Sequence, residues 1–328
     1  MTTKDIGSSQ QQKKQSRFNR PEAVLIAGPT ASGKTALAIE LSKMLGARIV
    51  NADSMQIYRD LHILSARPSR EEEAQAPHVL FGHVPSHEAY SVMRWLSDFE
   101  VELEAARKEE VPLIVVGGTG LYFKALLEGI SLMPEISQDI RQYWREESCH
   151  KTAEYLHSIL REKDPVVAAR LKEGDTQRIV RALEVIEGTG KSLSYWQQNR
   201  STPLLGSSDH VSVVLAPERK ALHERIHRRF ELMMEAGAEQ EAVALTSQGL
   251  DPSLTVMKAI GVKQLSLAAA GEVLRDAAIE RSKTETRQYA KRQMTFFNGQ
   301  LPMWPQLDPL NAADREACID TLGKAFAK

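Results

Sequence analysis

The sequence predicts an α/β fold, in which a parallel sheet is flanked by helices and interrupted by an all-helical insertion. Two observations predict the sheet: short apolar runs that end in turn residues, and helical patterns that alternate with them. A third predicts the insertion, because residues 133–204 carry helical segments with almost no strand signal. A chain of 328 residues is long enough for a core domain and an insertion of this size.

The first predicted strand covers residues 23–28, an apolar run that ends in glycine and is typical of a buried parallel strand. The helix after it carries a stripe of leucines on one face and ends at Gly46. Residues 47–54 form the second predicted strand. Because a helix connects the two strands, we expect them to lie parallel.

A long helix is predicted next over residues 91–110, with Ser91 as its N-cap. Residues 111–118 form a third buried strand, and residues 211–216 form a fourth beyond the insertion. Strands that alternate with helices in this way form a parallel sheet with right-handed crossovers.

The insertion is predicted over residues 133–204, and its clearest helix begins at Asp175. Residues 21–132 and 205–320 form the predicted core domain on either side of it. Residues 1–20 are polar and contain no apolar segment, so we expect a disordered tail rather than a secretory signal.

Composition narrows the classes of protein to which the chain can belong. The formal net charge is −1, so a polyanionic partner would have to bind a local basic patch. Cys149 and Cys318 lie far apart and in no metal-binding spacing, which argues against a disulfide framework or a zinc site. No apolar run reaches membrane-spanning length. We expect a cytoplasmic protein, monomeric and not bound to a membrane.

A phosphate-binding pattern, G-x-x-x-x-G-K-[ST], follows the first predicted strand and opens the first helix. Its members are Gly28, Pro29, Thr30, Ala31, Ser32, Gly33, Lys34 and Thr35. The glycines let the backbone wrap an anion, and the amides at the helix N-terminus point at phosphate oxygens. Lys34 adds a positive charge, and the Thr35 hydroxyl can bind Mg²⁺. The loop predicts a site for a diphosphate or a triphosphate.

The acidic residue that accompanies this loop stands in an unusual place. Nucleotide-hydrolysing proteins of this type carry a metal-binding acid at the end of a second apolar strand, but here residues 117–120 are GGTG. The acid is Asp53, at the end of strand 47–54. Because the carboxyl ends of parallel strands face one crevice, we expect Asp53 and Thr119 near the loop. There they can activate a nucleophile or bind Mg²⁺, although Asp53 also fits a simple turn or helix cap.

Several further motifs follow in a fixed order, and the whole set resembles the bacterial tRNA dimethylallyltransferases. After GPTASGKT come DSMQIY, GGTGLYFKALLEG, DPVVAARL, DTQRIVRALEV, AIGVKQL and TRQYAKRQMTFF, within residues 24–299. The resemblance implies transfer of a dimethylallyl group from dimethylallyl diphosphate to N6 of the adenine next to the anticodon. The tRNAs would be those reading codons that begin with U. It implies the tRNA anticodon stem-loop as partner and Mg²⁺ as cofactor.

The resemblance also implies roles for matching residues. Asp53 would be the general base that takes a proton from adenine N6, Lys34 would bind the leaving group, and residues 28–35 would hold the diphosphate. Thr35 and Thr119 would be the metal ligands, with Thr119 at the reacting centre. The residues implied in tRNA binding are Asp53, Ser54, Met55, Gln56, Thr119, Arg141, Gln177, Arg178, Ile179, Val180, Arg181, Ala259, Ile260, Gly261, Val262, Lys263 and Gln264.

A basic segment, residues 218–230, is expected on the phosphate side after the fourth strand. Arg225 and Arg229 lie four residues apart on one helix face and could reach phosphate, with Arg225 the stronger candidate. A solvated helix face with internal ion pairs explains this pattern equally well. Two positions depart from the family: Arg67 replaces a common lysine and would take over its phosphate role, and Val262 replaces a common tyrosine.

Three other functions share part of the pattern. A small-molecule kinase would use the same loop and sheet, but it predicts an acidic metal ligand after the third strand and gives no reason for QRIVR or TRQYAKRQ. A prenyltransferase of free AMP or ADP is similar in the core but lacks a large helical insertion. A non-catalytic RNA-binding protein would not need Lys34, Thr35, Asp53 and Thr119 together. Transfer to tRNA is the interpretation that explains all the motifs.

Overall fold

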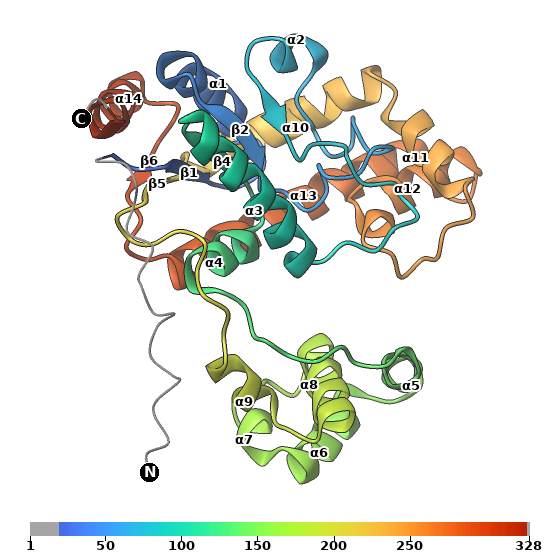
Figure 1. The fold of residues 1–328 in the computed structure, drawn as a ribbon. Helices are drawn as coiled ribbons and strands as arrows, with labels where there is room; N and C mark the ends of the chain where they lie inside the picture. Colours follow the sequence, from blue (N-terminus) through green and yellow to red (C-terminus); the bar gives the residue numbers. More distant parts are fainter. Residues whose placement is uncertain (1–19, 327–328) are drawn as a thin grey trace, which may run out of the picture. The chain divides into compact units, whose positions relative to one another are not determined.

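A computed structural model of the chain describes residues 20–326 (Figure 1). The described residues divide into two compact units, one formed by residues 20–127 and 205–326, the other by residues 128–204. The predicted tail lies outside the described residues except for Arg20.

The first unit contains a six-stranded sheet of order β3-β2-β4-β1-β5-β6, in which every pairing is parallel. The strands are β1 (Ala23–Ala27), β2 (Arg48–Asn51), β3 (His78–Val79), β4 (Leu113–Gly117), β5 (His210–Leu215) and β6 (Gln306–Leu307). The four predicted strands are all present, and the predicted α/β fold is confirmed.

The central strand, β1, lies between β4 and β5 and is completely buried. Its Val24 and Ile26 pack in one hydrophobic cluster with α1 (Lys34–Leu45) and α14 (Ala312–Phe326), and Figure 1 shows both helices along this side of the sheet. Because side chains alternate along a strand, Leu25 faces the other side. Burial on both faces explains why the strand is an unbroken apolar run.

Helix ends in this unit follow their local sequence. α1 ends at Gly46, whose φ of 62° lies in the left-handed region that favours glycine. α3 (Val92–Glu109) begins after Ser91, whose hydroxyl accepts a hydrogen bond from the Arg94 amide at 3.2 Å. Both ends agree with the sequence prediction.

The remaining helices of the first unit are α2 (Arg70–Glu73), α4 (Gly120–Glu128), α10 (Arg219–Glu235), α11 (Ala238–Thr246), the 3₁₀ helix η1 (Val256–Lys258), α12 (Val262–Ala269) and α13 (Arg275–Gln300). α10, α11, α12 and α13 share a hydrophobic cluster that includes Phe230, Ala242, Leu265 and Ala278. Among the described residues, none of the helices combines the length and the apolar composition that a membrane span requires.

The second unit is helical, as predicted for the insertion. It contains α5 (Gln138–His150), α6 (Ala153–Lys163), α7 (Pro165–Ala168), α8 (Thr176–Thr189) and α9 (Leu193–Gln198). Its own core includes Trp144, Leu156 and Leu183. Asp175 caps α8 by accepting a hydrogen bond from the Arg178 amide. The unit begins at residue 128, whereas the sequence predicted a start at 133.

Candidate active site

The phosphate loop connects β1 to α1 at the carboxyl edge of the sheet. Gly33 adopts a φ of 93°, a backbone angle that residues other than glycine rarely adopt. This conformation lets the loop turn into the helix. A Cβ atom at Gly28 would lie 3.0 Å from the Leu215 carbonyl oxygen of β5. These two glycines therefore allow the tight path of the loop beside its neighbouring strand.

Lys34 lies at the start of α1, and its Nζ donates a hydrogen bond to the Pro29 carbonyl at 2.6 Å. Burial lowers the pKa of Lys34 to about 7, the Asp53 charge opposes this change, and the Arg229 charge adds to it. An anion bound in the loop would favour the charged ammonium group. Lys34 therefore has the electrostatic setting of an anion-binding residue.

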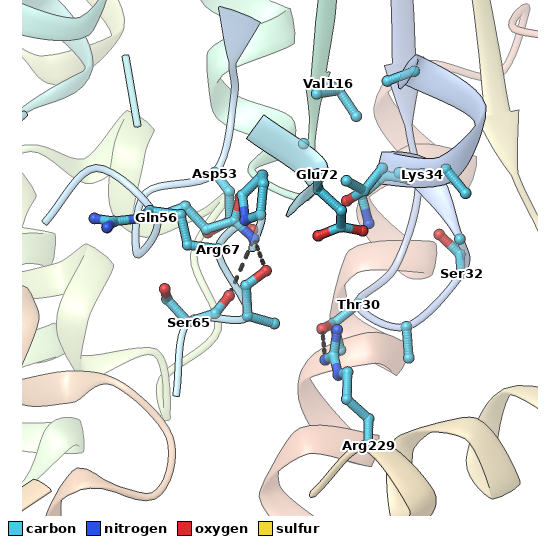
Figure 2. A pocket seen from close by; sticks show the side chains of 18 of the residues that line it. Thr30, Ser32, Lys34, Asp53, Gln56, Ser65, Arg67, Glu72, Val116 and Arg229 are labelled. Atoms are coloured by element: carbon cyan, nitrogen blue, oxygen red, sulfur yellow. Dashed lines mark hydrogen bonds between the residues drawn. The ribbon is translucent and has the colours of Figure 1, made fainter. Parts of the chain in front are cut away.

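Two arginines of α10 also reach the phosphate loop. Arg225 Nε donates a hydrogen bond to the Ala31 carbonyl at 2.8 Å, and Arg229 donates to the Thr30 hydroxyl (Figure 2). Arg225 is exposed, whereas Arg229 is half-buried, and burial lowers its pKa to about 10. Arg229 is thus the more enclosed of the two, in contrast to the preference for Arg225 drawn from the sequence.

These cations line a pocket of about 590 Å³, large enough for a small organic diphosphate. Figure 2 shows Lys34, Thr30 and Arg229 on one side of it and Asp53 and Gln56 on the other. Every residue from Thr30 to Thr35 lines the pocket, and part of its wall is apolar, formed by Ala38, Ile49, Phe81 and Val116. The pocket can therefore hold a charged group and an apolar group together.

The Asp53 carboxylate stands after β2, on the side opposite the cations. Its Oδ1 accepts a hydrogen bond from the Met55 amide at 2.9 Å, and its Oδ2 faces Gly118. Thr119 lies beside it, because the Thr119 hydroxyl accepts from the Ser54 amide at 2.9 Å and donates to the Ser54 hydroxyl at 3.2 Å. The loops after β2 and β4 thus meet, as expected for one edge of a parallel sheet.

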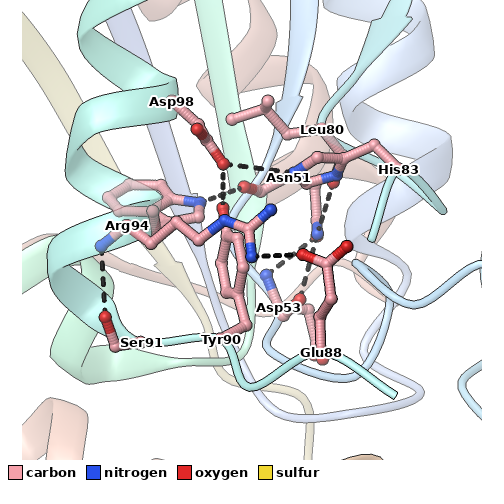
Figure 3. A network of polar contacts seen from close by, with 10 residues as sticks. Asn51, Asp53, Leu80, His83, Glu88, Tyr90, Ser91, Arg94 and Asp98 are labelled. Atoms are coloured by element: carbon pink, nitrogen blue, oxygen red, sulfur yellow. Dashed lines mark hydrogen bonds and ion pairs between the residues drawn. The ribbon is translucent and has the colours of Figure 1, made fainter. Parts of the chain in front are cut away.

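A buried amide, Asn51 at the end of β2, holds the backbone on which Asp53 sits (Figure 3). Its Oδ1 accepts from the Asp53 amide at 2.8 Å, and its Nδ2 donates to the carbonyl oxygens of Asp53 at 3.0 Å and Leu80 at 3.1 Å. The Trp95 indole donates to the Asn51 carbonyl at 2.8 Å. Sequence reasoning missed Asn51, although a buried asparagine that ends an apolar strand needs polar partners.

Gln56 and Arg67 stand on the same side of the pocket as Asp53. Gln56 Nε2 donates hydrogen bonds to the carbonyl oxygens of Ser65 at 3.1 Å and Ala66 at 3.0 Å. Both amide hydrogens of Gln56 are therefore used inside the protein, and its carbonyl oxygen is the group left for a ligand. Arg67 donates a hydrogen bond to the Tyr58 carbonyl at 3.3 Å. Because Arg67 also lines the pocket, its positive charge can take part in anion binding.

The helical unit presents only part of its predicted tRNA segment at the surface. Gln177 and Arg178 are exposed, and Arg181 is partly exposed and pairs with Glu184 at 2.9 Å. The side chains of Ile179 and Val180 are buried in the core, where they cannot contact RNA. Arg141 lies on α5 and is half-buried.

The segment 259–264 in the first unit also contains both buried residues and residues with exposed surface. Ala259 and Val262 are buried against a hydrophobic cluster, and Gly261, also buried, adopts a φ of 96°. Ile260 and Gln264 are half-buried, and Lys263 is exposed. The replacement of a common tyrosine by Val262 therefore affects packing rather than an exposed surface.

Comparison with known families decides what kind of site this is. Residues 56–300 match the family described as IPP transferase, and residues 21–83 match the one described as isopentenyl transferase. The chain belongs to the IPP transferase family. It is therefore a prenyltransferase, and the resemblance found in the sequence motifs is confirmed.

Relatives of this IPP transferase match it along most of the chain. It is 49% identical over 286 residues to the tRNA dimethylallyltransferase of Chelativorans sp. strain BNC1, covering 87% of this chain and 98% of that protein. It is 51% identical over 280 residues to the tRNA dimethylallyltransferase of Beijerinckia indica, covering 85% and 93%.

Solved structures give the same result for the fold. The tRNA isopentenylpyrophosphate transferase of Bacillus halodurans matches with a TM-score of 0.68 and 28% identity, covering 94% of this chain and 97% of that chain. A eukaryotic dimethylallyltransferase described as acting on tRNA matches with a TM-score of 0.76 and 26% identity, covering 92% and 79%.

Proposed function

We propose that the protein transfers the dimethylallyl group of dimethylallyl diphosphate to N6 of adenine 37 in tRNA and releases diphosphate. The names of the relatives support this reaction. The observation that carries it is the pocket in which the cations of the phosphate loop and α10 stand opposite the Asp53 carboxylate. Such an arrangement separates a site for a leaving anion from a site for proton removal.

The cationic side of the pocket stabilises the negative charge that develops on the leaving diphosphate. The bond between the allylic carbon and the diphosphate oxygen breaks, and its electron pair goes to that oxygen. Lys34 and Arg229 are already positioned at the loop, so they can stabilise this charge without large rearrangement. The apolar wall formed by Ile49, Phe81 and Val116 suits the hydrocarbon part of the donor.

The acceptor side supplies a base for the amine. As the new carbon–nitrogen bond forms at N6, the nitrogen loses a proton, and Asp53 is the proposed acceptor of it. Asp53 Oδ1 is used by the Met55 amide, which leaves Oδ2 for this role. The adenine has to leave the loop stack to reach the pocket, as bases do in other enzymes that modify them.

Mg²⁺ is the proposed cofactor, and the donor set fits it in part. Thr35 lines the pocket directly after Lys34 and carries a hydroxyl, and oxygen donors together with phosphate oxygens suit this ion. The Thr119 hydroxyl accepts a hydrogen bond from the Ser54 amide and donates one to the Ser54 hydroxyl, so its oxygen keeps one lone pair with which Thr119 could bind a metal. When bound, the ion would neutralise diphosphate charge.

Exposed polar residues outside the pocket are the proposed tRNA contacts. Gln177, Arg178 and Arg181 in the helical unit and Lys263 in the first unit remain available to RNA phosphates. We expect Arg181→Ala to weaken tRNA binding and to leave diphosphate binding unchanged. The protein is further proposed to act as a monomer, and a tRNA substrate supports a cytoplasmic location.

The function is tested with purified protein, dimethylallyl diphosphate and a tRNA of a type that reads codons beginning with U. Nucleoside mass spectrometry should find N6-dimethylallyladenosine with this tRNA and none with the same tRNA carrying guanine at the target position. The reaction should need Mg²⁺. Product formed from free AMP but not from tRNA would contradict the proposal.

A further inference from the structure

A buried amide of α13 bonds to two loops of the active site at once. Gln293 of α13 is 4% exposed. Its Oε1 accepts a hydrogen bond from the Thr30 amide in the phosphate loop at 2.8 Å, and its Nε2 donates to the Gly118 carbonyl after β4 at 3.0 Å. The phosphate loop is the proposed donor site, and residues 117–120 carry Thr119 of the acceptor site. Gln293 therefore connects the two sides of the proposed reaction.

Glycines in the GGTG segment make this close approach of α13 possible. A Cβ atom at Gly118 would lie 2.0 Å from Gln293 Nε2, and a Cβ atom at Gly120 would lie 2.2 Å from the Phe296 ring. Neither glycine has a positive φ, so backbone conformation does not explain their presence. The need for space beneath α13 does explain it, and it shows that the contact is built into both segments.

A second side chain on the same face of α13 reaches the acceptor side. Tyr289 precedes Gln293 by one helical turn, and its hydroxyl lies beside Thr119 and Gln293. Burial, with a smaller contribution from the Asp53 charge, raises the pKa of Tyr289, so this hydroxyl stays protonated. One face of one helix thus contacts the donor loop and the acceptor loop.

We propose that Gln293 is a positioning residue that holds the phosphate loop and the Thr119 loop at a fixed separation. The proposal rests on the prenyl transfer proposed above. Transfer needs the allylic carbon and the amine within about 3–3.5 Å of each other, and a misplacement of about 1 Å can cost roughly a hundredfold in rate. The donor is held by one loop and the acceptor by the other, so their separation depends on what joins the loops.

The two bonds require one acceptor and one donor at the end of the side chain. Methionine has a similar length but supplies no donor and only a weak acceptor. A protonated carboxylic acid supplies both, whereas an ionised carboxylate loses the donor and faces the Gly118 carbonyl with a negative charge. In Gln293→Glu, burial and the Asp53 charge favour the protonated form, while Lys34 and Arg229 favour the ionised form. This variant should therefore work at low pH and fail as the pH rises.

The test compares Gln293→Met, Gln293→Glu and the control Phe297→Leu in steady-state transfer. Phe297 is 1% exposed on the same helix, and its side chain offers no hydrogen bond to either loop. Gln293→Met should lower kcat by about a hundredfold while the Kd for tRNA stays within about twofold. Phe297→Leu should lower the Tm but keep kcat within about threefold.

The pH profile separates positioning from plain stabilisation. The ratio of kcat/KM between Gln293→Glu and wild type should fall by about tenfold or more from low to high pH as the carboxyl group ionises. A flat ratio, or a Gln293→Met enzyme with wild-type kcat, overturns the proposal. If the wild-type protein transfers no prenyl group, the proposed function fails on its own. In that case, calorimetry with inorganic diphosphate tests the role of Gln293 separately. Weaker diphosphate binding by Gln293→Met than by the wild type supports the proposal that Gln293 holds the phosphate loop, and equal binding overturns that proposal.

Discussion

Diphosphate binding should return a proton to Lys34, and this proton can be counted. In the protein without diphosphate, burial lowers the pKa of Lys34 to about 7 from its ordinary value of 10.5. A bound diphosphate places negative charge beside Nζ and raises the pKa again. Binding must therefore take up a proton at any pH above the lowered pKa and below the raised one.

The size of the effect follows from this pKa. At about pH 7.5, roughly three quarters of the empty molecules carry a neutral Lys34, so binding should take up about 0.75 proton from this group. At about pH 6 the uptake should be about 0.1. Because the neutral form must be protonated first, the affinity should fall with rising pH, approaching about tenfold per pH unit well above 7.

Isothermal titration with inorganic diphosphate measures the uptake, using two buffers with different ionisation enthalpies. The control is Lys34→Arg, because a guanidinium group stays charged throughout this pH range. Protons released or taken up by the diphosphate itself appear in both proteins and cancel in the difference. We expect the wild type to exceed the control by about 0.75 proton at about pH 7.5. Equal uptake in both proteins would refute the electrostatic reasoning about Lys34.

Three further changes have defined outcomes. Lys34→Met should abolish transfer yet stabilise the empty protein by roughly 1–2 kcal/mol near pH 7, after discounting for the partial exposure of the side chain. Because Lys34 binds its proton less tightly in the folded protein than in the unfolded chain, the wild-type stability should rise with pH between about 7 and 10.5. Thermal melts of the wild type and of Lys34→Met across this pH range measure both effects. Asn51→Leu leaves three backbone groups of Asp53 and Leu80 without their partner and should destabilise by roughly 3 kcal/mol in urea unfolding, with wild-type stability as the contrary result. Arg229→Met should weaken binding of inorganic diphosphate by about tenfold, more than Arg225→Met does; the reverse order would contradict the burial argument.

The parts of the fold that the sequence predicted are those with strong local signals. β1, β4 and β5 contain buried apolar runs, and α1 and α3 have clear end signals in Gly46 and Ser91. β3 and β6 were not predicted, because each has two residues and two residues cannot show a strand pattern. These two strands form where the chain runs beside an edge of the sheet, β3 along β2 and β6 along β5.

The site divides in the same way. Lys34, Asp53 and Thr119 could be brought together from sequence because they follow parallel strands, whose carboxyl ends meet at one edge. Gln293 could not, because its partner Gly118 lies 175 residues away and its role depends on the path of α13. A usable signal does exist, since Tyr289 and Gln293 are polar residues one turn apart on a helix face that also carries the apolar Phe297.

Surface roles were the hardest to predict from sequence. The segment that contains Ile179 and Val180 resembles a tRNA-binding motif as a whole, but a helix turns these two residues toward the core. Arg178 and Arg181 have exposed surface on the same helix and remain candidates for RNA contact. A linear motif cannot separate the residues that contact a ligand from those that hold the helix in place.

The central claim is that a base and a leaving-group site share one pocket, and single-turnover transfer by Asp53→Asn tests it most directly. Asparagine keeps the size of the side chain and can still accept from the Met55 amide, but it cannot take the proton from N6. Transfer should fall by about 10²–10⁴-fold, while tRNA and inorganic diphosphate bind within about twofold of wild type. Transfer at the wild-type rate would contradict the assignment of Asp53 as the base.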